Sequence, residues 1–247
     1  MNAMKIAVAG GTGAVGRHVV DVARESGHDV VVLTRSNGVD LVSGSGLADA
    51  LTGVDAVIDV ASKQTMSAKE STQFFTTVTR NLLAAEKAAG VAHHVALSIV
   101  GSDQAPYAYY AGKVAQEKAI GVGDIPWTVL RATQFHEFAG QIYGQVKLGP
   151  FVVVPKMRSQ PIAAREVAER LVDIAEGTPA GLVPDLGGPC EEQMVDMVRD
   201  YAATLPGKHW VLELPVPGAY GQAMRDGTLV PGPGADHGTQ TFRDWLA

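Results

Sequence analysis

A cluster of four glycines near the amino end constrains the fold of this chain more than any other feature. Gly10, Gly11, Gly13 and Gly16 fall within seven residues, between an apolar run at 5–9 and a helical pattern. Glycine loses more conformational entropy on folding than any other residue. Such a density at the junction of two elements therefore indicates that something approaches the main chain closely.

Short apolar runs alternate along the chain with longer helical patterns, which is typical of βαβ units around a parallel sheet. The runs do not alternate polar with apolar residues, as expected for strands covered on both faces. Expected strands lie at 5–9, 29–34, 55–60, 93–98 and 127–132, with a short strand at 39–42. Expected helices start near Ala14, Gly46, Ser67 and Tyr107. The sequence thus predicts an α/β fold with a doubly wound parallel sheet.

Glycines stand where these helices should end in a left-handed residue, at Gly27, Gly53, Gly90 and Gly121. The helix after Ser67 repeats apolar residues every three or four positions, which predicts one buried face. That face consists of Phe74, Phe75, Val78, Leu82 and Ala85.

The composition changes after residue 134. Helical patterns remain at 164–176 and 191–205, but 206–238 is rich in proline and glycine, which predicts turns and short pieces instead of further βαβ units. We expect a core at 1–134 that binds a dinucleotide. Residues 135–247 are expected to form a small discontinuous cap on that core, as part of one structural unit.

Charge and composition exclude several classes of partner. The formal net charge is −6, and no dense run of Lys and Arg could follow a phosphate backbone, so we expect no nucleic acid partner. No apolar stretch reaches the roughly 18 residues that span a bilayer, and no secretory segment precedes the first strand. The single Cys190 agrees with a reducing compartment. We therefore expect a cytoplasmic protein with no membrane partner.

The glycine cluster satisfies G-x-G-x-x-G between a strand and a helix, where this motif binds dinucleotides. The glycines permit a tight turn, and Gly13 lets a pyrophosphate come against the backbone. The following helix presents free N–H groups and a partial positive charge to that anion. The alternative is a glycine-rich turn without a ligand.

The end of the second expected strand discriminates between the two nicotinamide dinucleotides. An acidic residue usually stands there and holds the ribose hydroxyls of NAD. Here the chain has Thr34, Arg35 and Ser36, which offer a cation and hydroxyls to a 2′-phosphate. This favours NADP(H), although Arg35 as an ordinary solvated arginine is the alternative.

Tyr109 and Lys113 are four residues apart and therefore lie on one face of the helix that follows the strand at 93–98. A phenol with a pKa near ~10 donates its proton poorly at neutral pH unless a nearby ammonium favours its anion. Tyr109 would then protonate an oxygen as hydride arrives on the neighbouring carbon. An exposed aromatic beside a solvated lysine is the alternative.

Four segments together resemble the atypical short-chain dehydrogenase/reductases of the NmrA-like, NAD(P)H-binding branch. They are GGTGAVG at 10–16, LTRS at 33–36, the Tyr109/Lys113 pair and WTVLRATQFHEF at 127–138. The resemblance covers essentially the whole chain. It implies a Rossmann core, a nicotinamide cofactor and a small C-terminal part that binds the substrate.

The resemblance also implies roles for individual residues. The pyrophosphate loop corresponds to Gly10, Thr12, Gly13, Ala14, Val15 and Gly16, and the segment beside the cofactor to Val60, Ala61 and Ser62. Lys113 would reach the nicotinamide ribose, and Gln134 and Phe135 would line the nicotinamide and substrate pocket. Ser98 is the candidate third catalytic residue. It is the leading residue of a serine cluster that this chain otherwise lacks, and the usual catalytic position of relatives falls on Ile99 or Val100.

These features predict an NADPH-dependent oxidoreductase that reduces a small carbonyl or quinone-like compound. A regulator that binds NADP(H) and senses its redox state without turnover is the alternative, with a protein partner or a second copy of the chain left open. A nucleotide-sugar epimerase is a third reading. No metal site is expected, because the zinc motif that starts at His136 and Glu137 has Gly140 in place of its second histidine.

Overall fold

The computed structural model describes residues 3–145 and 147–247, which form two compact units. The first unit runs to Arg131 and resumes at Arg165–Pro184, and the second comprises Ala132–Ala164 and Asp185–Ala247. The expected boundary at 134 did not include the return of 165–184 to the first unit. In this segment Arg165 forms a 2.6 Å ion pair with Glu25, and Glu176 Oε1 lies 2.6 Å from His28 Nε2.

The first unit is built on a sheet in the order β2-β1-β3-β4-β5, with β9 beside β5. The pairs β1·β2, β1·β3, β3·β4 and β5·β9 are parallel. The strands are β1 Lys5–Ala9, β2 Asp29–Leu33, β3 Ala56–Asp59, β4 His93–Ile99, β5 Trp127–Ala132 and β9 Gly181–Leu182. The strand order reverses at β1, and the expected α/β fold with a doubly wound parallel sheet is confirmed.

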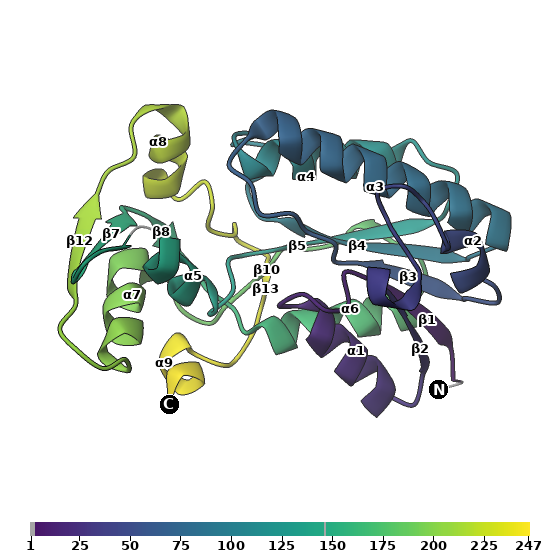
Figure 1. Ribbon diagram of the computed structural model, residues 1–247, viewed down its shortest axis with the longest axis horizontal. Coiled ribbons are helices and arrows are strands. Elements are labelled where there is room, and N and C mark those ends of the chain that lie inside the picture. Colours follow the sequence, from purple (N-terminus) through teal and green to yellow (C-terminus); the bar gives the residue numbers. More distant parts are fainter. Residues whose placement is uncertain (1–2, 146) are drawn as a thin grey trace. The chain divides into compact units, whose positions relative to one another are not determined.

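Helices cover both faces of this sheet (Figure 1). They are α1 Gly16–Glu25, α2 Leu47–Ala50, α3 Ala68–Ala89, α4 Tyr109–Gly121 and α6 Ala164–Glu176. Figure 1 shows α3 and α4 on one face and α1 and α6 on the other. Phe75, Val78 and Leu82 of α3 are buried as expected, and Phe74 and Ala85 are partly buried. This burial of apolar side chains on both faces explains why the strands read as continuous apolar runs.

The short strand expected at 39–42 is wrong, because side chains take up the backbone groups that a strand would pair. The Asp40 carboxylate accepts hydrogen bonds from the N–H groups of Val42 (2.8 Å) and Ser43 (3.3 Å). Asn81 Nδ2 of α3 donates to the carbonyl oxygens of Leu41 and Val42. An aspartate that bonds its own following backbone forms a turn and competes with a β-ladder.

Glycine ends two of the four expected helices as predicted, at Gly27 and Gly90, whereas α2 ends at Ala50, is capped by Leu51 (φ −89°) and reaches the left-handed Gly53 only two residues later. Gly27, Gly53 and Gly90 have φ values of +84°, +69° and +75°. Gly121 is the other exception, because it is the last residue of α4 and the helix is capped by Val122, with φ −103°. At the start of α3, the Ser67 hydroxyl accepts from the N–H of Glu70, as expected for a helix that begins there.

The second unit contains a three-stranded sheet in the order β12-β7-β6. Its elements are α5 Phe138–Gln145, β6 Lys147–Leu148, β7 Phe151–Pro155, β8 Arg158–Ser159, β10 Leu186–Gly187, β11 Glu192–Gln193, α7 Met194–Ala203, β12 Trp210–Leu214, α8 Gly218–Asp226, β13 Asp236–His237 and α9 Phe242–Leu246. The expectation of turns and short pieces at 206–238 is therefore wrong in part. A five-residue strand, β12, returns parallel to β7 after α7, and α8 follows it. The prolines and glycines stand mainly between these elements and do not prevent them.

Within the described ranges, no helix is long and apolar enough to cross a membrane.

Candidate active site

The glycine cluster forms a turn that leaves no room for a side chain at Gly10 or Gly16. A Cβ atom on Gly16 would lie 2.1 Å from the carbonyl oxygen of Gly10, and one on Gly10 would lie 2.8 Å from the backbone of Ala61. Gly10 also has a φ of +82°, and its carbonyl oxygen accepts a 2.9 Å hydrogen bond from the N–H of Gly13. The turn at the end of β1 therefore packs directly against the segment after β3. Both segments contain residues that were expected to bind the cofactor.

The exposed part of this turn fits the pyrophosphate of a dinucleotide. Thr12 and Gly13 are exposed, whereas Val15 and Gly16 are buried, and Ala14 is half-buried. Val15 caps α1 without a side-chain hydrogen bond to the first turn. The N–H of Arg17 donates to the carbonyl oxygen of Gly13 (3.2 Å), and no capping side chain covers the other N–H groups at that helix start, so an anion can approach them, which the helix dipole also favours.

The end of β2 carries the predicted cation. Arg35 begins a short 3₁₀ helix, Arg35–Asn37, and is exposed. No ion pair holds Arg35 within residues 3–145 and 147–247. Thr34 Oγ1 and Ser36 Oγ on either side of it lie 2.9 Å apart. The three residues therefore place a guanidinium and two hydroxyls at one strand end, and their expected contact with a 2′-phosphate stays a prediction.

The end of β3 contributes a buried carboxylate that the sequence analysis missed. Asp59 is fully buried and accepts hydrogen bonds from the N–H of Ala61 (3.0 Å) and from Nε2 of Gln116 (2.8 Å). The signal for it was a single acidic residue that ends an otherwise apolar strand, AVID. Because Ala61 also packs against Gly10, Asp59 helps to fix the segment of Val60, Ala61 and Ser62 beside the glycine turn.

Tyr109 is held at the start of α4 by contacts along its whole length. Its hydroxyl lies 2.9 Å from Ser62 Oγ, its ring packs edge-on against Phe75, and its carbonyl oxygen accepts a 2.7 Å hydrogen bond from Ser71 Oγ. Burial raises the pKa of the Tyr109 phenol, the hydrogen bond from Ser62 lowers it, and the charge of Asp59 raises it again. The structure therefore brings Tyr109 to the segment that was expected to run beside the cofactor.

Lys113 lies one turn further along α4 and points into the interior. Its side chain is buried, with Nζ 4.4 Å from the centroid of the Phe75 ring, and it donates to Oε1 of Gln116. Burial lowers the pKa of Lys113 to about 8, against the opposing charges of Asp59 and Glu117. Within the described part of the chain no hydrogen bond joins Lys113 to Tyr109. The lysine is instead linked through Gln116 to Asp59.

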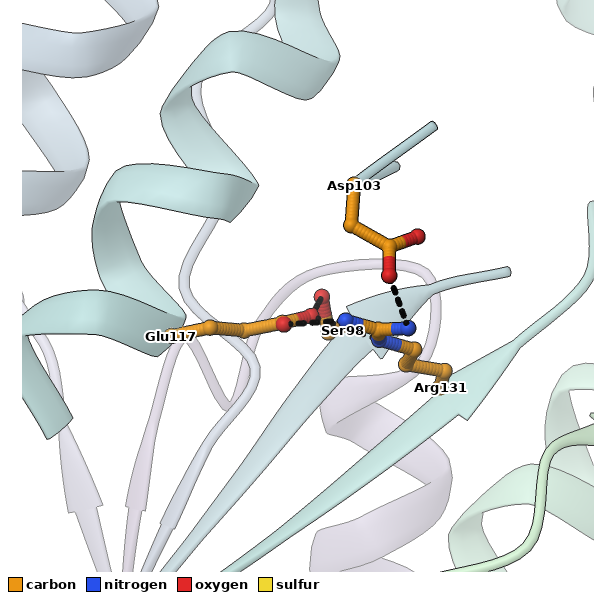
Figure 2. Close-up of polar contacts among 4 residues, drawn as sticks. All are labelled: Ser98, Asp103, Glu117 and Arg131. Atoms are coloured by element: carbon orange, nitrogen blue, oxygen red, sulfur yellow. Dashed lines mark hydrogen bonds and ion pairs between the residues drawn. The ribbon is translucent and has the colours of Figure 1, made fainter. Parts of the chain in front are cut away.

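Ser98 belongs to a different polar network, which is shown in Figure 2. It is buried at the end of β4 and donates its hydroxyl hydrogen to Oε1 of Glu117 on α4. Arg131 on β5 holds the same carboxylate through Nε (3.0 Å) and Nη2 (2.6 Å), and its Nη1 reaches Asp103 at 3.0 Å. Glu117 raises the pKa of the Arg131 guanidinium further above its usual range. Ser98 is thus engaged with Glu117, and the hydroxyl at Tyr109 is that of Ser62.

Gln134 and Phe135 belong to the second unit. Oε1 of the buried Gln134 accepts a 2.8 Å hydrogen bond from Ser159, and Phe135 forms an isolated bridge with Ile162. Their expected role in lining a pocket stays a prediction.

A glycine-rich turn between a strand and a helix, at the point where the strand order of a parallel sheet reverses, defines a dinucleotide-binding protein of the Rossmann class. A family model described as NAD(P)H-binding matches residues 10–177. The chain belongs to this NAD(P)H-binding family, which confirms the resemblance and the expectation of a nicotinamide dinucleotide.

One similar protein is the photosystem II assembly factor Ycf39 of Synechocystis sp.. It is 30% identical over 147 residues, which are 53% of this chain and 45% of that protein. The matched segment thus spans less than half the length of that relative.

Solved structures of the extended short-chain dehydrogenase/reductase kind share the fold. The NAD-dependent NDP-hexosamine 5,6-dehydratase TunA is 17% identical with a TM-score of 0.73, covering 98% of this chain and 95% of TunA. A nucleoside-diphosphate-sugar epimerase from Staphylococcus aureus is 16% identical with a TM-score of 0.69, over 98% and 99% of the two chains. UDP-glucose 4-epimerase of Thermus thermophilus in complex with NAD is 19% identical with a TM-score of 0.66, over 85% and 86%. At these identities the likeness concerns the fold.

Proposed function

We propose that this chain is an NADPH-dependent oxidoreductase that reduces a small carbonyl or quinone-like compound. The single observation that carries the proposal is the 2.9 Å contact between Tyr109 Oη and Ser62 Oγ. It places the Tyr109 phenol, whose pKa is shifted by its surroundings, beside the segment that packs against the glycine turn. A proton donor next to a dinucleotide site is the arrangement that reduction of a carbonyl requires.

Different residues of the first unit would bind different parts of the dinucleotide. The N–H groups after Gly13 would hold the pyrophosphate, and Arg35 with its flanking hydroxyls would hold the 2′-phosphate of NADP(H). Val60, Ala61 and Ser62 would run beside the nicotinamide ribose. The reduced nicotinamide, when bound, supplies a hydride.

Tyr109 would give its proton to the substrate oxygen, and Lys113 would assist without touching it. The buried charge of Asp59 raises the pKa of Tyr109 and so opposes formation of the phenolate. Lys113 offsets this carboxylate because Gln116 bonds both groups. The ammonium thereby keeps the phenol a stronger acid than burial beside Asp59 alone would leave it.

The test is consumption of NADPH over a panel of aldehydes, ketones and quinones. We expect turnover by the wild type and a loss of about 100-fold or more in Tyr109→Phe, since general acid catalysis contributes that much. Tyr107→Phe is the matched control, because Tyr107 is an exposed tyrosine outside the Ser62 contact, and we expect it to keep full activity. NADPH binding without consumption over the whole panel would overturn the proposal.

A second candidate is a regulator that binds NADP(H) and does not turn it over. Two observations favour it: Ser98 is bonded to Glu117 and Lys113 to Gln116, so neither polar group faces Tyr109. The similarity to an assembly factor points in the same direction. A sensor of redox state must bind oxidised and reduced cofactor with different affinities. Equal affinities for NADP⁺ and NADPH in calorimetry would exclude it.

A further inference from the structure

Two serines stand at the carboxyl ends of neighbouring strands in the first unit. The hydroxyl of one is exposed beside a tyrosine, and the hydroxyl of the other is buried and bonded to a carboxylate. Ser62 follows β3, is exposed, and contacts Tyr109 Oη at 2.9 Å. Ser98 lies in β4, is 3% exposed, and donates to Glu117. We propose that Ser62 is a catalytic residue which, together with Tyr109, binds the oxygen of the carbonyl substrate, and that Ser98 only positions α4. This inference rests on the proposed function and deepens it.

The contact between Ser62 and Tyr109 is fixed from the side of the tyrosine. The main chain enters α4 through Ala108, which has φ +49° and ψ −124° and is the one non-glycine residue with a positive φ in the described ranges. Such a conformation is strained for a residue with a side chain and persists only where the surroundings enforce it. Ser71 enforces it here by bonding the Tyr109 carbonyl, and Gly112 permits a close approach, since a Cβ there would lie 2.1 Å from Ser71 Oγ.

The contact is also fixed from the side of the serine. Asp59 accepts from the N–H of Ala61, the residue directly before Ser62, and Ala61 packs against Gly10. Ser62 is therefore carried by a segment braced on the buried carboxylate and on the glycine turn. The result is a pair of hydroxyls, one phenolic and one aliphatic, of which Ser62 faces solvent and is open to a substrate.

The two hydroxyls suit the reduction of a carbonyl. Hydride adds to the carbonyl carbon, and the electron pair of the C=O π bond moves onto the oxygen. That oxygen takes the proton of Tyr109 Oη, so one O–H bond breaks on the tyrosine and one forms on the alcohol product. Ser62 donates a hydrogen bond to the substrate oxygen while negative charge develops on it, and afterwards to the Tyr109 phenolate, which takes its new proton from water. Hydrogen bonds aimed at developing negative charge are strong in a partly buried site.

Ser98 is not free to play this part. Its hydroxyl donates a hydrogen bond to the Glu117 carboxylate, which also accepts two hydrogen bonds from Arg131, as Figure 2 shows. Turning the hydroxyl of Ser98 elsewhere would remove a charge-assisted hydrogen bond from a largely buried ion pair. The side chain is thus engaged in joining β4 to α4 and β5.

The first experiment compares Ser62→Ala with Ser98→Ala, the same chemical change at the two positions. We expect Ser62→Ala to lower kcat/KM for the carbonyl about 10- to 100-fold while leaving NADPH affinity within about threefold. Ser98→Ala should keep kcat/KM within about threefold and lower the melting temperature instead. Ser62→Thr, which retains a hydroxyl, should recover activity, and Ser62→Val, which has the shape of that threonine but no hydroxyl, should not. Wild-type kcat/KM in Ser62→Ala, or an equal loss in both alanine variants, would overturn the inference.

A second measurement separates failure of this inference from failure of the proposed function. The pKa of Tyr109 is followed by the ultraviolet absorbance of the phenolate, as the difference between each protein and its Tyr109→Phe partner. Because Ser62 stabilises the phenolate by hydrogen bonding, we expect Ser62→Ala to raise this pKa and Ser98→Ala to leave it unchanged. An unchanged pKa in Ser62→Ala would overturn the inference even if the enzyme turns over. Absence of turnover in the wild type would overturn the proposed function with it.

Discussion

Arg131 grips both carboxylate oxygens of Glu117, with Nε–Oε1 at 3.0 Å and Nη2–Oε2 at 2.6 Å. The two side chains are only 14% and 17% exposed. Arg131→Met would leave a nearly buried carboxylate without its cation, and we expect a loss of about 3 kcal/mol in the free energy of unfolding. Urea denaturation measures it. The matched control is Arg158→Met, since Arg158 pairs with Glu191 at more than a third exposure and should contribute less than about 1 kcal/mol.

Gly13→Ala should weaken cofactor binding without preventing folding. A Cβ there would stand 3.2 Å from the carbonyl oxygen of Gly10, a contact that a small shift relieves, but glycine at this position of the motif lets the pyrophosphate approach the backbone. We expect NADPH affinity to fall about 10-fold or more, measured by calorimetry. Gly232→Ala is the control, because a Cβ there meets nothing within 4 Å. Unaltered NADPH affinity in Gly13→Ala would remove the glycine turn from the cofactor site.

Arg35→Asp should reverse the preference between the two dinucleotides. It removes the cation proposed for the 2′-phosphate and supplies the carboxylate that holds ribose hydroxyls in NAD-binding relatives. We expect NADPH affinity to fall about 10- to 100-fold and NADH affinity to hold or rise. Lys69→Asp makes the same change of net charge at an exposed site on α3 and controls for it. If both variants bind NADPH equally well, Arg35 does not select the cofactor.

Lys113 should make stability depend on pH in the alkaline range. The folded chain holds its pKa near 8, whereas an unfolded lysine titrates near ~10.4. Between these values the unfolded state binds more protons than the native state, so stability rises with pH. Relative to Lys113→Met, the wild type should gain about 2–3 kcal/mol in the free energy of unfolding from pH 7.5 to 10.5. Urea titrations at four pH values measure this difference, and a flat difference would show that Lys113 is not desolvated.

Ala108→Gly should stabilise the protein, against the usual effect of glycine. Ala108 has a φ of +49°, where glycine is not strained, so the substitution should gain up to about 1 kcal/mol after the added entropy of the unfolded chain. Ala111→Gly, three residues on in the regular part of α4, should instead lose about 1 kcal/mol. Thermal unfolding distinguishes the two signs. A loss of stability in both variants would mean that the turn before Tyr109 stores no strain.

The sequence by itself determined the main strands and the place of the glycine turn. Both follow from local chemistry: apolar runs that need cover on two faces, and glycines such as Gly10 and Gly16 at positions where a side chain does not fit. It also determined that Tyr109 and Lys113 share a helix, because helical spacing is local. The position of Arg35 at the end of β2 was predictable as well, because the end of a strand is also read from the local sequence.

Only the tertiary structure decided which side chains meet. Ser62 and Tyr109 are 47 residues apart, and Asp59 and Gln116 are 57 apart, so no local pattern records that they bond. The turn at 39–42 formed because Asn81 from a distant helix takes its carbonyl groups. Ser98 is drawn to Glu117 because Arg131 fixes that carboxylate beside it. The physical reason is general: a buried polar group must find a partner, and the fold alone sets which partner lies within reach.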